Sequence, residues 1–143
     1  MAVTATISNH CKYQLWAGAI DIDSHVIKCA LMGTGFTFDK DTHAAWTNVS
    51  ASEITAGSGY TSGGETLTTV TISEDDTDDR GQWTCDDVTF TASGGDWDAA
   101  VAAVIWDDSS ADDTVIGCIE FGQSHVVSDG QSFTIQDIIG RIT

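Results

Sequence analysis

The chain has 143 residues, the length of one domain, and carries 22 acidic against 5 basic side chains for a net charge of −17. A field of that sign repels phosphate backbones, which argues against nucleic-acid binding, and it favours basic or cation-bearing partners. The sequence contains neither an apolar run long enough for a membrane span nor the pattern of a secretory signal, so we expect a single domain over 1–143 that is not a membrane protein.

The first predicted element is a short helix. Ser8 is a suitable N-cap, residues 9–17 follow it, and Gly18 can end the helix. Its apolar stripe consists of Cys11, Leu15 and Trp16. Residues 25–33 come next and predict a strand, because they are rich in β-forming side chains and end at a glycine.

Residues 39–64 have the composition of a long surface excursion, with glycines throughout their second half. Ser50 and Glu53 have the S-x-x-E spacing of a capping box, which predicts a helix of one or two turns before Gly57.

The rest of the chain is strand-like. A change of hydrophobic register across Asp86 and Asp87 predicts a bend or bulge there. The predicted strands are 65–73, 82–92, 99–106, 114–122 and 131–143. Together they predict a mainly β fold, an antiparallel β-sandwich or jelly-roll-like architecture with one short N-terminal helix and one short helix in a loop.

We expect no enzyme and no cofactor, because the sequence contains neither a nucleophile elbow nor a phosphate-binding loop. The cysteines lie in apolar or alternating segments without a CxxC pair, which favours buried free thiols. The histidines are scattered and do not form a zinc pattern. The cysteines are Cys11, Cys29, Cys85 and Cys118, and the histidines are His10, His25, His43 and His125.

The stretch "SEDDTDDRGQW", residues 73–83, admits two interpretations. In the first, it begins a calcium loop with Asp76, Asp78 and Asp87 as ligands, but Arg80 then occupies a ligand position and the flanks are strands. In the second, which we favour, residues 75–81 are an exposed hairpin turn. A cation site built from two loops, with ligands from Asp107, Asp108, Asp112 or Asp113, is a further alternative.

Trp97 follows a Gly-Gly turn and stands between two aspartates. An aromatic side chain in such a loop either anchors a contact with a partner or folds back over the core. Trp106 ends an apolar run and is expected to lie in a core strand.

Taken in order, the segments "KYQLWAGAID", "VIKCALMGTGFTFDKDTHAAW", "GSGYTSGGETL" and "AAVIWDDSSADDTVIGCIEFG" carry a family resemblance. The chain resembles, over about residues 7–138, a family of small proteins that tailed bacteriophages encode among their virion structural genes. This resemblance implies a head decoration, or cement, protein that binds the outer surface of the capsid shell and stabilises the head.

The implied partners are the major capsid protein and copies of the protein itself, with a trimer compatible with threefold positions. The implied location is the outer head surface of the virion, assembled in the host cytoplasm. In that role residues 1–8 form an extended arm onto the capsid. The predicted contact residues are Val3, Ile7 and Trp97. The alternatives are a tail, neck or fibre component, or, from another class, a calcium-dependent or carbohydrate-binding β module.

Overall fold

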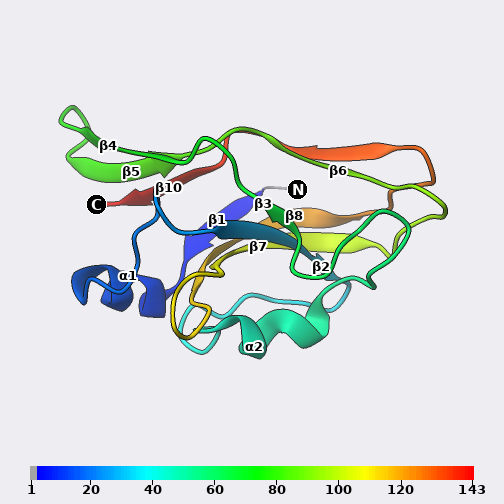
Figure 1. Ribbon diagram of the computed structural model, residues 1–143, viewed down its shortest axis with the longest axis horizontal. Coiled ribbons are helices and arrows are strands. Elements are labelled where there is room, and N and C mark those ends of the chain that lie inside the picture. The colour runs from blue at the N-terminus through cyan, green and yellow to red at the C-terminus, as the bar shows by residue number, and fades with distance from the viewer. Residues whose placement is uncertain (1–2) are drawn as a thin grey trace.

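The computed structural model describes residues 3–143 as a mainly β, antiparallel structure with two short helices, which confirms the predicted fold class (Figure 1). In chain order the elements are β1 (Thr4–Ile7), α1 (Asn9–Trp16), β2 (Ile27–Gly33), α2 (Trp46–Val49), the 3-10 turn η1 (Ser50–Ser52), β3 (Glu65–Thr66), β4 (Thr71–Asp75), β5 (Arg80–Thr84), β6 (Val88–Thr91), β7 (Ala100–Asp107), β8 (Val115–His125), β9 (Ser132–Ile135) and β10 (Ile139–Ile142). The helices within this range are too short and too polar to cross a membrane.

The strands form one large sheet and two small ones. The large sheet has the order β1-β8-β7-β2-β3, and the small sheets are β10-β5-β4 and the pair β6-β9. Figure 1 shows the small sheets on one side of the large sheet and α2 on the other. The arrangement is that of a sandwich whose second layer is divided into two pieces.

The central strands of the large sheet are buried on both faces. In β2, Cys29 and Leu31 belong to the core beneath the small sheets, whereas Ala30 and Met32 belong to the core beneath α2. Successive side chains of a strand point to opposite faces, so a strand covered on both sides needs apolar residues at every position. This explains why the β7 segment is a continuous apolar run.

The predicted limits of α1 are confirmed. The Ser8 hydroxyl accepts a hydrogen bond from the backbone N–H of Cys11 at 2.9 Å, and Gly18 follows the helix with a φ of 70°. The predicted apolar stripe is only partly correct. Cys11 is buried and Leu15 half-buried, but Trp16 is 92% exposed, because a residue five positions after Cys11 lies about 140° around the helix from it.

The capping box predicted at Ser50 and Glu53 is wrong. The helix of this loop, α2, lies one turn earlier, and Glu53 follows η1 in an extended conformation. The Glu53 carboxylate instead accepts hydrogen bonds from the Tyr60 hydroxyl at 2.8 Å and the Gly63 N–H at 2.6 Å. These partners from the same loop outweigh the local capping preference, which is worth only about 1 kcal/mol.

Three predicted strands are each divided in two. Residues 65–73 form β3 and β4, residues 131–143 form β9 and β10, and residues 82–92 form β5 and β6 with the predicted bend between them. In each case the two halves belong to different sheets. Thr69 and Asp137, which lie in two of these breaks, have left-handed backbone conformations that end the extended run.

A substitution at Gly64, directly before β3, tests how tightly this part of the chain packs on β2. Its φ is 82°, and a Cβ at this position would overlap the backbone carbonyl of Cys29. We expect Gly64→Ala to lower the free energy of unfolding by about 3 kcal/mol or more, because strain and overlap add. Gly35→Ala, with a φ of 87° and open space around its Cβ, is the matched control and should lose only about 1 kcal/mol. Urea denaturation measures both, and equal losses would contradict the packing argument.

Candidate binding groove

An apolar groove runs along β1, between the large sheet and the small sheet β10-β5-β4. It consists of three adjoining cavities. The first, of about 210 Å³, lies between α1 and the β4–β5 hairpin. The second, of about 220 Å³, lies between β1 and β10, and the third, of about 450 Å³, lies between β1, β8 and β9.

Shared lining residues show that the three cavities adjoin one another. Ile7 and Trp83 line both the first and the second cavity, and Ala5 and Ile139 line both the second and the third. Isoleucine is the most frequent residue in the lining. The groove is therefore a surface suited to apolar contacts over the length of β1.

Charged side chains of Asp, Glu, Lys and Arg are sparse in the groove. Asp21 lines the first cavity, Arg141 the second and Asp137 the third. Each outer cavity is therefore bordered by one exposed aspartate and the middle cavity by one exposed arginine.

Trp83 and Gly140 form the base of the groove. Trp83 is a buried residue of β5, and Gly140 lies opposite it on β10. A Cβ at Gly140 would overlap the indole of Trp83, so a glycine at this position lets the ring lie across the neighbouring strand. Both residues line the first two cavities.

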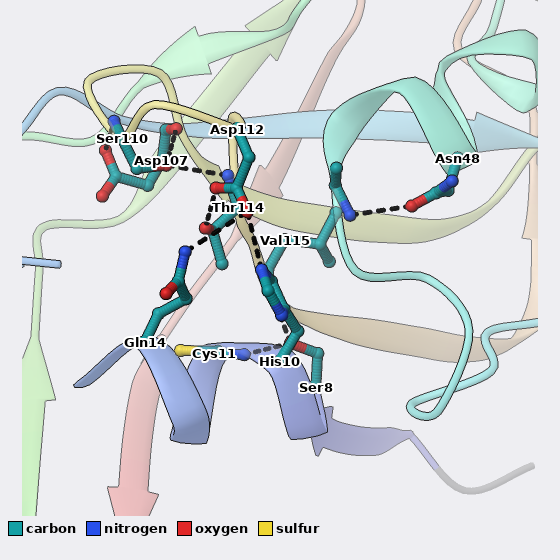
Figure 2. A network of polar contacts seen from close by, with 11 residues as sticks. Ser8, His10, Cys11, Gln14, Asn48, Asp107, Ser110, Asp112, Thr114 and Val115 are labelled. Atoms are coloured by element: carbon teal, nitrogen blue, oxygen red, sulfur yellow. Dashed lines mark hydrogen bonds and ion pairs between the residues drawn. The ribbon is translucent and has the colours of Figure 1, made fainter. Parts of the chain in front are cut away.

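A polar network holds α1, one wall of the groove, against the large sheet (Figure 2). The Ser8 N–H donates to the carbonyl of Ile116 at 2.9 Å, and the Ser8 hydroxyl donates to the carbonyl of Val115 at 2.5 Å. Ser8 is fully buried, so these bonds and the cap at Cys11 tie the start of α1 to β8.

Asp112, in the turn between β7 and β8, forms the second part of this network (Figure 2). Its carboxylate accepts hydrogen bonds from His10 Nε2 at 2.6 Å, Gln14 Nε2 at 3.2 Å and the Thr114 hydroxyl at 2.5 Å. Desolvation alone would raise the pKa of Asp112, but the hydrogen bonds from Thr114 and His10 outweigh it and lower the pKa. The ionised carboxylate therefore joins α1 to the β7–β8 turn.

Asp107 is fully buried at the end of β7. It accepts hydrogen bonds from His25 Nδ1 at 2.7 Å and from the backbone N–H groups of Ser109 and Ser110 at 2.9 and 3.2 Å. The pairs His25–Asp107 and His10–Asp112 are 82 and 102 residues apart in the chain. No local pattern marks contacts at that separation, so sequence reasoning did not find them.

These partners bear on the cation site suggested for the β7–β8 turn. Asp107 and Asp112 already accept hydrogen bonds from the protein, and Asp108 forms an ion pair with Lys28 at 3.0 Å. Within residues 3–143, no three His, Cys, Asp or Glu side chains are grouped so that they could hold a metal ion.

The calcium candidates of residues 73–83 do not form a site either. Asp76 and Asp78 lie in the tight turn between β4 and β5, whereas Asp87 follows the opposite end of β5. Asp87 instead accepts a hydrogen bond from the N–H of Asp137 at 3.3 Å. The hairpin interpretation is confirmed.

Arg80 explains how the acidic hairpin turn is held. Its guanidinium lies 2.9 Å from the carboxylate of Asp75 and 2.8 Å from that of Asp78. Arg80, which occupies a ligand position in the calcium-loop interpretation, therefore neutralises part of the negative charge of the turn.

The three predicted contact residues have different environments. Val3 is 64% exposed and lines the third cavity, and Ile7 lines the first two. Trp97 is only 6% exposed, packs edge-on against Tyr60 and donates from Nε1 to the carbonyl of Ser58 at 2.8 Å. The contact interpretation of Trp97 is therefore wrong, because the ring belongs to the core.

The predicted arm also differs from what is observed. Residues Thr4–Ile7 are strand β1, paired in register with β8 of the same chain, because their backbone groups find partners at the edge of the large sheet. Residues 1 and 2, which the same prediction included, lie outside the described residues.

The cysteines are free thiols, as predicted. Burial raises the pKa of Cys11, beside the first cavity, to about 12, with the charge of Asp107 adding to the effect. Burial raises the pKa of Cys85 to about 11 and those of Cys29 and Cys118 further. Neutral thiols of this kind pack as small apolar side chains and are poor nucleophiles.

Comparison with protein-family models, with curated proteins and with solved structures gave no match for this chain.

Asp107 is expected to be the most important single carboxylate for stability. Asp107→Ala leaves the imidazole of His25 and two backbone N–H groups without their acceptor, and we expect the free energy of unfolding to fall by about 3 kcal/mol. Asp108→Ala removes the neighbouring, partly exposed ion pair and should cost less than about 1 kcal/mol. Urea denaturation at neutral pH measures both, and a loss at Asp107 no larger than at Asp108 would refute this role.

Calcium should not stabilise the protein. Asp76 and Asp78 are separated from Asp87 by the length of β5, and the carboxylates of Asp107, Asp108 and Asp112 already have partners in the protein. We expect the unfolding temperature to be the same in millimolar calcium and in chelator, because only an ion that binds the folded state raises it. A reproducible rise with calcium, lost in Asp76→Asn, would show that the hairpin binds the ion after all.

Proposed function

We propose that the protein is a non-enzymatic structural protein of a tailed-bacteriophage virion, which decorates and stabilises the head by binding the outer surface of the major capsid protein shell. The resemblance over residues 7–138 supports this assignment. The observation that carries it in the structure is the row of three adjoining cavities along β1, since it offers a macromolecular partner a long, mainly apolar surface.

The exposure of the groove's rim favours a partner. Val3, Ile72, Ile139 and Ile142 are all large apolar side chains that line the groove and remain more than a third exposed. Contiguous apolar surface of this kind on a soluble protein usually marks an interaction site. Covering it removes apolar area from water, which is the main favourable contribution to association.

The charge of the chain suits the same role. An exterior with a net charge of −17 repels DNA, so such a protein would not compete for the packaged genome. A protein that binds only the assembled shell stabilises the shell by mass action, in proportion to the free energy of binding.

Copy number tests the proposal. We expect purified particles of the phage that encodes the chain to contain the protein in hundreds of copies, and particles lacking the protein to lose DNA at a lower temperature. Quantitative mass spectrometry gives the number, and dye release on heating gives the stability. Tens of copies or fewer would favour a tail, neck or fibre component, and absence from purified particles would refute a virion role.

A further inference from the structure

We infer that the groove takes an extended segment of a partner protein, which adds as a strand at the free edges beside the groove and carries apolar side chains at its centre and basic side chains at its ends. The inference rests on the proposed function, because an assembly role requires a partner that supplies the segment.

Two free strand edges border the groove. Within residues 3–143, β1 is the last strand of the large sheet and β10 is the last strand of the small sheet, so each pairs with a neighbouring strand on one side only. Residues 5–7 of β1 and 138–141, which include the start of β10, line the same middle cavity. Backbone N–H and C=O groups at an unpaired edge are ready to bond an added strand.

The shape of the groove fits a strand better than a helix. The three cavities follow one another along β1, from Val3 in the third cavity to Ile7 in the first. Side chains i, i+2 and i+4 of an extended chain point to the same side and lie about 7 Å apart. One face of an added strand therefore places successive side chains in successive cavities.

Charge decides which kind of chain is favoured. Asp21 and Asp137, both exposed, border the two outer cavities, and the whole molecule adds a strongly negative field. Lys or Arg residues at both ends of the segment complement them, while the middle cavity, with Arg141, does not need a base.

The same charges argue against a second copy as the occupant. Another molecule of this chain brings a net charge of −17 to the contact, and its residues 1–11 contain no Lys or Arg. Like charges brought together oppose association. The partner that fits is therefore a different protein with a basic, extended segment.

A synthetic peptide tests the inference on the isolated full chain. The probe alternates threonine and valine at its centre and has lysines at both ends, with blocked termini; its controls carry glutamates at the ends, or N-methyl groups on the central backbone. By titration calorimetry we expect the lysine peptide to bind at least about tenfold more tightly than the glutamate peptide, with a difference that shrinks as salt is added. N-methylation should abolish binding, because it removes the strand's backbone donors.

Matched variants locate the binding. The double variant Val3→Ser, Ile139→Ser removes apolar side chains from the rim of the groove, and Trp16→Ser, Val126→Ser removes exposed apolar side chains that line none of its three cavities. The groove variant should bind the lysine peptide about tenfold more weakly or worse, while the control keeps its affinity. Hydrogen exchange should slow in residues 4–7 or 139–142 of the complex.

Several outcomes would overturn the inference: no binding of the lysine peptide, equal binding of the glutamate peptide, equal loss in both variants, or no new protection in β1 and β10. A dimer in ultracentrifugation that the groove variant abolishes would make a second copy the occupant and overturn it as well. Failure of the proposed function can be distinguished from failure of this inference. Absence from virions leaves a positive peptide result intact, whereas abundant copies on the head without peptide binding reject the inference alone.

Discussion

The structure depends on the burial of the large sheet on both faces. β2 and β7, at its centre, contribute side chains alternately to the core beneath the small sheets and to the core beneath α2. The second core is closed by Trp106, which stacks on Trp46 with ring centroids 4.6 Å apart and donates to the carbonyl of Gly63 at 3.1 Å. Because neither face tolerates water, the rest of the chain must supply two covers, and its loops and short strands are arranged around that requirement.

The groove follows from the way one cover is built. The second layer consists of two separate small sheets, and neither pairs with β1. The space between β1 and β10 is therefore lined by side chains of both layers but filled by neither. Ser8 and Asp112, through their contacts with β8 and α1, hold the end wall of this space in position, so that the groove is part of the folded structure rather than of a mobile loop.

Sequence reasoning succeeded where the signal was local. The Ser8 cap, the glycine after α1 and the hairpin at 75–81 depend on residues within a few positions of one another, and all were found. It failed where distant groups compete. Glu53 accepts hydrogen bonds from Tyr60 and Gly63 instead of capping a helix. The Trp97 ring points into the core, where it packs against Tyr60 and Phe90 and donates a hydrogen bond to the carbonyl of Ser58. Val3 and Ile7 were predicted as contact residues, and the groove that both of them line was not predicted.

By itself, the sequence determined the mainly β class, the strand-rich second half, the acidic exterior and the thiols that pack as apolar side chains, because period, composition and charge are properties of the chain. Only the tertiary structure decided which strands share a sheet, that residues 4–7 pair within the chain, and that Asp107 and Asp112 are matched with His25 and His10. Those outcomes depend on contacts between residues up to about a hundred positions apart, whose free energies arise only when the two cores are closed.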